Sequence, residues 1–488
     1  MGDAAFKYGS SAPEGQRPRE RVTEGSRRWS ASNRLRLTFR KRDGIALIVS
    51  NVVGVGIFTT PALVANLVPN PSAMLALWMV GGALALAGAS SYARLASLWP
   101  TAGGEYVYLS KTYGPAAGFL SGWTSLIAGF SGSVAASAVA VVMFAGQYFP
   151  GLASSREVFS LDLFGFTFAV SPLTLAAAFL ILLFAALHIC SLTAGKLTQN
   201  ALAVVLVGMV AVFAVRGFAG GSGSWSHLHS PETHVGTMNW LLALIPVMFT
   251  YSGWNAAAYV SEEIHASRRS MRPVLLGGTA IVIGLYTVLN ALYLYAIPGG
   301  QMRSATNVAE AAAHVLFGPG TSLVTPALIV ALLGAVSAMT IAGPRVYFAM
   351  ARDGAFIPAF ARTSARFGTP APAIVLQALW SIALVMLGGF DQILMYTGFA
   401  IVLSSGAAVA GLFVLRRRGL TPVKRSQLIV PAIFALASAA MVFDTVLEAP
   451  RIALIGVLLI AAGIPVYALC RRKGTAAQFA LLPGEAGD

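Results

Sequence analysis

NVVGVGIFTTP, residues 51–61, lies inside a long apolar run and contains two glycines two positions apart, followed by a proline. Glycine destabilises the middle of a helix, and proline removes a backbone donor and clashes with the preceding turn. Gly54 and Gly56 do not stack on one helix face, so they do not form the small-xxx-small pattern of helix packing. We predict that a helix is interrupted here to form a binding site; a tolerated flexible point is the alternative.

The whole chain is too apolar for a water-soluble protein. Of its 488 residues, 57% are hydrophobic and 10% are charged, and the mean hydropathy is +0.73. A helix crosses a bilayer with about 20 apolar residues. Apolar runs predict an all-α integral membrane protein with twelve transmembrane helices, near residues 44–67, 72–98, 114–149, 168–190, 195–216, 239–262, 273–297, 323–351, 372–389, 392–415, 427–447 and 452–470.

The distribution of basic residues predicts the orientation of these helices. If residues 1–42, a basic tail expected to be disordered, lie in the cytoplasm, then 29 of the 33 Lys and Arg residues lie on that side. Both termini, including a second tail at 473–488, are then cytoplasmic, and the plasma membrane (the inner membrane of a bacterium) is the expected location. This topology explains the net charge of +15, so no nucleic-acid partner is predicted.

A second interruption occurs five predicted helices later, in FTYSGWNAAAYVSEEI, residues 249–264. There Ser252 and Gly253 break the sixth apolar run. Interrupted segments at matching places in two halves of a chain indicate a transporter built from inverted repeats. We predict one repeat at 43–217 (helices 1–5), an outer loop at 218–238, a second repeat at 239–416 (helices 6–10), and two added helices at 417–472.

Interrupted helices in a membrane expose backbone groups that a ligand can use. Unpaired backbone survives at this depth only where it is buried in protein or lines a cavity. The amides freed at the start of the second half-helix form a positively polarised end that suits a carboxylate, and freed carbonyls suit an ammonium group. The predicted donors are the amides of Val55, Gly56 and Ile57; the predicted acceptors are the carbonyls of Val52, Val53, Phe249 and Thr250.

Four stretches resemble the amino acid–polyamine–organocation (APC) superfamily, and within it the amino acid permeases close to the L-type exchangers. They are NVVGVGIFTTP (51–61), PTAGGEYVYLSKTYGP (100–115), FTYSGWNAAAYVSEEI (249–264) and AGPRVYFAMARDG (342–354). The resemblance implies a LeuT-like fold of 5+5 inverted repeats with broken helices 1 and 6, and transport by alternating access. It implies an amino acid substrate in a lipid bilayer.

The resemblance also implies roles for single residues. Residues 55–57 would bind the substrate carboxylate, and the carbonyls of Val52, Val53 and Phe249 its amine, with the Phe249 ring as a gate over the substrate. Trp254 and Asn255 would support the unwound turn and line the pocket. Helix packing or interface anchoring is the alternative for Phe249, Tyr251 and Trp254. The complete predicted substrate site is Val52, Val53, Gly54, Val55, Gly56, Ile57, Phe249, Thr250, Tyr251, Gly253, Trp254 and Asn255.

Ion coupling by Na⁺ or H⁺ is left open by the sequence. Many relatives carry a lysine in helix 5 seven residues after a glutamine, but here Gln199 is followed at that distance by Leu206. Ser337 and Thr340 could supply oxygen ligands to Na⁺, although such hydroxyls commonly bond to their own helix.

Three charged residues form a second expected group. Glu262, Glu263 and Arg345 are expected to form a cytoplasmic gate; solvated charge for the glutamates and snorkelling for Arg345 are the alternatives.

Small apolar residues dominate the expected cavity walls, which favours neutral L-amino acids over a cationic substrate. The alternatives are a polyamine or organic-amine carrier of the same fold, and an amino acid sensor that does not transport. No enzyme, cofactor or metal site is predicted. The two cysteines, Cys190 and Cys470, are expected to be unpaired, and residues 150–167 contain no cysteine for a disulfide-linked heavy subunit.

Overall fold

A computed structural model describes residues 35–163, 166–229, 237–318, 324–388, 390–421 and 423–473. Most of the predicted tail at 1–42 and of the tail at 474–488 lies outside these ranges. Residues 35–40, which the sequence assigns to the basic tail, pack against the protein. Leu35 and Phe39 are buried, and Phe39 pairs with Ile264 as a single parallel bridge.

The first half of the described chain contains helices α2 to α9 and one hairpin. Their bounds are α2 Lys41–Val52, α3 Gly56–Leu67, α4 Pro71–Leu98, α5 Glu105–Tyr113, α6 Pro115–Thr124, a π-helical turn η1 Ser125–Gly129, α7 Phe130–Ala145, β1 Phe159–Leu163, β2 Phe166–Val170, α8 Pro172–Cys190 and α9 Leu192–Gly220.

The second half is helical throughout its described elements. Their bounds are η2 Trp225–His229, α10 Thr237–Thr250, α11 Ala256–Tyr259, η3 Ser261–Glu263, α12 Ser267–Ala296, α13 Gly299–Ser304, α14 Val308–Phe317, α15 Val324–Arg352, η4 Pro358–Ala361, α16 Ala371–Leu387, α17 Phe390–Arg417, η5 Arg425–Leu428, α18 Ile429–Glu448, α19 Pro450–Ala461 and α20 Gly463–Lys473.

The described residues include nine helices that are long and apolar enough to cross a membrane. The pair α2 and α3, bent by 49° at its break, makes a tenth span if it is counted as one. Three further apolar helices among the described residues are shorter, namely residues 239–250 of α10, α14 and α16. The chain is therefore an integral membrane protein.

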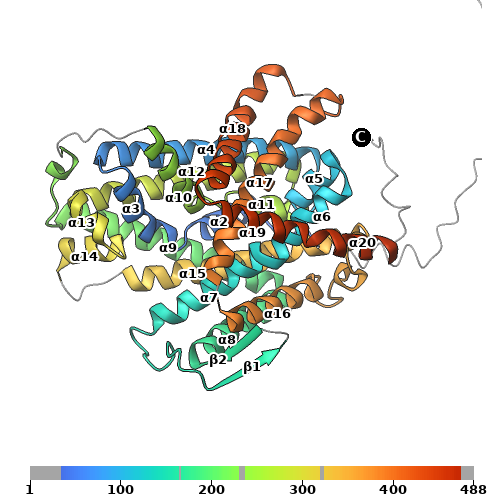
Figure 1. The fold of residues 1–488 in the computed structure, drawn as a ribbon, viewed down its shortest axis with the longest axis horizontal. Helices are drawn as coiled ribbons and strands as arrows, with labels where there is room; N and C mark the ends of the chain where they lie inside the picture. The colour runs from blue at the N-terminus through green and yellow to red at the C-terminus, as the bar shows by residue number, and fades with distance from the viewer. Residues whose placement is uncertain are drawn as a thin grey trace, which may run out of the picture.

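Most of the long helices run along the long axis of the molecule, and α15 lies among them with nearly all of its last sixteen residues buried (Figure 1). The short helices α13 and α14 cover one end, while α5 lies toward the other (Figure 1). Residues 305–317, ATNVAEAAAHVLF, have the pattern of a short amphipathic helix, and α14 occupies 308–317 of this segment. Helices α18 and α19 are the least buried of the span candidates, which fits their place outside the two predicted repeats.

The all-α expectation has one exception among the described residues. β1 and β2 form an antiparallel hairpin in which Phe159 is opposite Val170 and Leu163 is opposite Phe166. Residues 159–163, FSLDL, alternate apolar and polar side chains as a strand does, but no strand was predicted here, and the predicted fourth membrane helix at 168–190 began inside β2. The hairpin lies beside α8 and α16 (Figure 1), away from the helix breaks.

Candidate functional site

The first predicted interruption is present between α2 and α3. α2 ends at Val52, Val53 has extended backbone, and α3 begins at Gly56. No described backbone carbonyl accepts a hydrogen bond from the amides of residues 54–57. The first amides of a helix have no partner within it and carry its positive partial charge. The break therefore presents free donors where the sequence predicts them.

The second predicted interruption lies between α10 and α11. α10 ends at Thr250, the chain turns through residues 251–255, and α11 begins at Ala256. Gly253 has φ +102°, a conformation that side chains with a Cβ rarely adopt. Glycine is thus required at this position by the backbone itself.

The two interruptions touch each other. The Asn51 side-chain amide donates to the Gly253 carbonyl at 3.2 Å. A Cβ on Gly56 would lie 2.9 Å from Thr250 Oγ1, so the start of α3 is packed directly against the end of α10. The structure therefore brings residues 52–57 and residues 249–255 together, as the sequence reasoning requires of one site.

A tyrosine that the sequence reasoning missed holds the two breaks together. The Tyr286 hydroxyl on α12 lies 2.9 Å from the Val52 carbonyl and 3.0 Å from the Thr250 carbonyl. These are two of the carbonyls predicted to accept from a ligand amine, and each retains a second lone pair. Nothing in the local sequence of α12 marks Tyr286, because its role depends on two carbonyls from other helices.

Tyr286→Phe is expected to destabilise the protein, because the two buried carbonyls lose the hydroxyl proton that they share. The loss is about 1–3 kcal/mol for an unsatisfied buried group. Tyr293→Phe is the matched control, since the Tyr293 hydroxyl is buried on the same helix with no partner among the described residues. Thermal unfolding in detergent should lower the melting temperature of the first variant only; equal shifts would contradict the bridging role.

The three aromatic residues of the second break have different surroundings. Phe249 is 43% exposed, and its ring would be 3.6 Å from a Cβ on Gly398 of α17. Tyr251 is buried against Trp78 and Tyr286, and Trp254 packs on Tyr92 with ring centroids 4.8 Å apart. Tyr251 and Trp254 thus occupy the packed side of the break, whereas Phe249 is the accessible ring.

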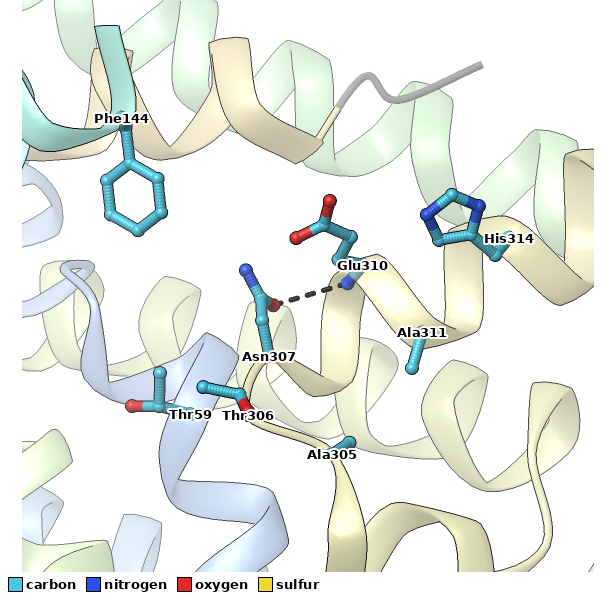
Figure 2. A pocket seen from close by; sticks show the side chains of 8 residues that line it. All are labelled: Thr59, Phe144, Ala305, Thr306, Asn307, Glu310, Ala311 and His314. Carbon is cyan, nitrogen blue, oxygen red and sulfur yellow. Dashed lines mark hydrogen bonds between the residues drawn. The ribbon is translucent and has the colours of Figure 1, made fainter. Parts of the chain in front are cut away.

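A cavity of about 420 Å³ lies beside the half-helix α3. Figure 2 shows its lining, in which Thr59 of α3 and Phe144 of α7 face the Glu310 carboxylate of α14. The Glu310 backbone amide donates to the side-chain oxygen of the capping residue Asn307 at 3.2 Å, and the Glu310 carboxylate points into the cavity (Figure 2). Glu310 is an acidic group in this cavity. It belongs to α14 and not to either interrupted helix.

The expected charged residues form two ion pairs away from this cavity. Arg345 of α15 pairs with Glu263 through two nitrogen–oxygen contacts of 2.7 and 3.1 Å, with side-chain exposures of 3% and 0%. Glu262 pairs with Arg352 at 2.8 Å and accepts from the Ala102 amide. Arg345 therefore has a buried partner and does not snorkel, and neither glutamate is simply solvated.

The hydroxyls considered as ion ligands already have partners. Ser337 Oγ lies 3.0 Å from His188 Nε2, and Thr340 Oγ1 donates to the Val336 carbonyl of its own helix. Gln199 is buried, and neither of its side-chain polar atoms has a partner among the described residues. Na⁺ binding at Ser337 and Thr340 stays a prediction.

Asn255 connects the second break to an acidic residue that the sequence analysis did not consider. Its side-chain amide donates to Glu105 Oε1 at 2.8 Å, and the Tyr92 hydroxyl donates to the same oxygen at 2.6 Å. Glu105 occurs inside one of the quoted stretches, GGEYVY, where an acid between glycines and tyrosines is the only indication that the sequence offers.

Comparison with known proteins gives one family. A family model described as "Amino acid permease" matches residues 43–470. The b(0,+)-type amino acid transporter 1 of Mus musculus is 26% identical over 414 residues, which cover 83% of this chain and 82% of that protein.

Two further relatives carry related descriptions. The Asc-type amino acid transporter 1 of Mus musculus is 25% identical over 451 residues, or 89% of this chain and 82% of that protein. The large neutral amino acids transporter small subunit 2 of Rattus norvegicus is 27% identical over 438 residues, or 87% and 78%. With two interrupted helices that meet at their breaks and a family match over most of its length, the chain belongs to the amino acid permease family, a family of membrane transporters and not of enzymes.

Proposed function

We propose that this protein is a secondary transporter that moves neutral L-amino acids across the plasma membrane by alternating access. The observation that carries the proposal is the contact between the two breaks, which puts free amides and free lone pairs of carbonyls side by side. A zwitterion needs donors for its carboxylate and acceptors for its ammonium group within a few ångströms. The names of the relatives support an amino acid as the substrate.

In this proposal the substrate carboxylate binds the amides of Val55, Gly56 and Ile57. The ammonium group binds the remaining lone pairs of the carbonyls at Val52, Val53, Phe249 and Thr250. The buried Asn51 side-chain oxygen, which has no partner among the described residues, is an additional acceptor at the same crossing. The side chain of the substrate then lies under the Phe249 ring, with Gly54 and Gly253 leaving room for its backbone.

The fold proposed for this activity has twelve spans, formed by the ten candidates together with α10–α11 and α16. Helices 1–5 and 6–10 are the two inverted repeats, with both termini in the cytoplasm. The buried Arg345–Glu263 pair and the Arg352–Glu262 pair then close the cytoplasmic side, while the exposed Phe249 ring and the cavity at Glu310 lie on the outer side. This arrangement corresponds to a state that is closed toward the cytoplasm.

Exchange is the proposed transport mode, with coupling to Na⁺ or H⁺ as the alternative. Purified protein in proteoliposomes should take up a labelled mixture of neutral amino acids only when unlabelled amino acid is inside. Uptake into empty vesicles driven by a Na⁺ or pH gradient would instead establish symport. No uptake of neutral amino acids, with uptake of a labelled polyamine, would favour the amine carrier, for which Glu310 is the supporting acid.

Binding without any uptake would favour the sensor. No disulfide-linked heavy subunit is expected, because residues 150–167 contain no cysteine. Activity of the chain reconstituted alone would agree with this expectation.

Phe249→Ala is expected to raise the KM for exchange about tenfold, equivalent to about 1.4 kcal/mol of lost binding. The reason is that the ring would no longer cover the bound substrate. Phe443→Ala is the control, because Phe443 is 64% exposed on α18 and is not part of the proposed substrate site. An unchanged KM in the first variant, with normal stability, would remove Phe249 from the site.

A further inference from the structure

Glu105 is a buried carboxylate held by neutral groups. It begins α5, which lies between the spans formed by α4 and by α6 and α7, and it is 4% exposed. Its Oε1 accepts from Tyr92 at 2.6 Å and from Asn255 at 2.8 Å, and the Tyr259 hydroxyl also bonds to it. All four residues are buried. A charge in such a place is costly unless a cation or strong hydrogen bonds compensate it.

No cation compensates Glu105 among the described residues. The charged groups near α5 are engaged elsewhere: Asp353 accepts from Tyr106, Arg352 pairs with Glu262, and Arg418 of α17 donates to the Thr112 carbonyl. The titratable groups that face Glu105 are tyrosines, namely Tyr92 of α4, Tyr108 of α5 and Tyr259 of α11, and α6 contributes none. Burial therefore outweighs the three hydrogen bonds and raises the pKa of Glu105 from 4.5 to about 7.

Protonation of Glu105 changes the strength of the hydrogen bonds that it accepts. The Tyr108 hydroxyl is buried without a partner among the described residues, and its ring packs on that of Tyr92 at 5.5 Å. The charge of Glu105 acts on Tyr108, so this hydroxyl belongs to the same buried cluster. Hydrogen bonds to an ionised acceptor are roughly twice as strong as neutral ones, so protonation weakens the hold of Glu105 on Asn255 and Tyr92.

Asn255 and Tyr92 connect the Glu105 carboxyl to the second break. Asn255 follows Gly253, whose carbonyl accepts from Asn51 of the first break. Tyr92 packs edge-on against Trp254, with ring centroids 4.8 Å apart. Both bonds to Glu105 therefore act on the turn at residues 251–255, and through it on the crossing of the two breaks.

We propose that Glu105 is a proton-binding site that couples protonation to the geometry of the substrate site through Asn255. The ionised carboxylate holds the turn in the conformation seen here, and the protonated form releases it for the change of access. This inference rests on the proposed transport function and adds H⁺ as its second ligand. Glu105 is a different residue from Ser337 and Thr340, whose hydroxyls were considered as Na⁺ ligands.

The first experiment compares exchange by the wild type and Glu105→Gln. Proteoliposomes preloaded with unlabelled leucine take up labelled leucine at equal internal and external pH, from pH 5.5 to pH 8.5. Wild-type exchange should fall about fivefold or more from pH 6 to pH 8, because a group with a pKa near 7 passes from about 90% to about 10% protonated. Glu105→Gln, which is permanently neutral, should be nearly independent of pH and fast at pH 8.

Glu157→Gln is the matched control, since Glu157 is exposed in the segment before β1. It should keep the wild-type profile. If the pH profile of Glu105→Gln equals that of the wild type, the inference is overturned. Measurable exchange by both proteins would still support the proposed transport function.

A second measurement does not depend on transport. The folded protein binds the Glu105 proton more tightly than the unfolded chain, so its stabilising effect is complete below about pH 4.5 and is lost as the pH rises through about 7. The difference in melting temperature, wild type minus Glu105→Gln, should therefore decrease as the pH rises from about 4.5 to about 7 and stay constant at higher pH. If no variant transports, this difference still supports the proton site; a difference that is flat with pH overturns it.

Discussion

Arg345→Met is expected to destabilise the protein by about 3–5 kcal/mol, the usual result of removing one partner of a buried ion pair. The variant leaves Glu263, whose side chain is 0% exposed, as an uncompensated charge. The pair also joins distant segments, because the Glu263 carbonyl accepts from the amides of Thr38 and Phe39 while Arg345 donates to the Ile341 carbonyl of α15. Thermal or denaturant unfolding in detergent measures the effect.

The double variant Arg345→Met with Glu263→Met separates stability from gating. Neutral side chains of similar length fill the same space without a buried charge, so its stability should return close to that of the wild type. If the pair is the cytoplasmic gate, this folded variant should nevertheless expose the cytoplasmic pathway. A cysteine introduced by Ser261→Cys, with Cys190 and Cys470 replaced by serine, should then react faster with a membrane-impermeant thiol reagent applied from that side.

Arg352→Met is the control for the stability measurement. Its pair with Glu262 is partly exposed, with side-chain exposures of 27% and 20%, so the loss should be less than about 1 kcal/mol. Equal losses of stability in Arg345→Met and Arg352→Met would show that burial does not make the Arg345–Glu263 pair costlier to break than the exposed pair. A stable double variant with wild-type labelling would assign the pair to structure and not to gating.

Gly253→Ala is expected to lower transport about 100-fold, equivalent to about 2.7 kcal/mol. The φ of +102° is unfavourable for alanine, and an added Cβ would clash with the Asn51 side chain and lie 3.0 Å from the Asn51 carbonyl. Asn51 cannot move away without leaving the Gly253 carbonyl unpaired. The substitution therefore separates the two breaks at their crossing.

Two glycine variants serve as controls for this result. Gly284→Ala adds a Cβ to open space on α12 and should change neither stability nor transport. Gly54→Ala also meets nothing within 4 Å, so the protein should fold normally. Because Gly54 lies in the break, this variant should raise the KM if the open space holds the substrate. Labelled uptake and melting temperature, measured together on all three, distinguish misfolding from a blocked site; normal transport by Gly253→Ala would contradict the proposed site.

The sequence alone predicted the features that depend on local composition. Apolar runs predicted the membrane helices, and glycines two apart predicted the break between α2 and α3, because the cost of glycine in a helix is a local property. Ser252-Gly253 predicted the second break for the same reason. The amphipathic pattern at 305–317 likewise predicted α14. The ordered segment at 35–40 was assigned to the tail, because its pairing with Ile264 is a long-range contact.

The tertiary structure decided which polar groups meet. Both glutamates at 262 and 263 follow one another in the sequence, yet only Glu263 is buried with Arg345, and the choice depends on the rotation of a 3₁₀ turn against α15. Ser337 and Thr340 looked equivalent as ion ligands, but His188 from another helix contacts only the first.

The position of the first helix break and the contacts that stabilise it were decided at different levels. Where the helix is interrupted follows from residues 51–61 themselves, since backbone propensity is set within a few neighbours along the chain. The groups that hold the two breaks in place, Tyr286, Asn51 and Glu105, are separated from their partners by up to 234 residues of sequence. A hydrogen bond is short and directional, so these partners were decided only when packing placed the helices at contact distance.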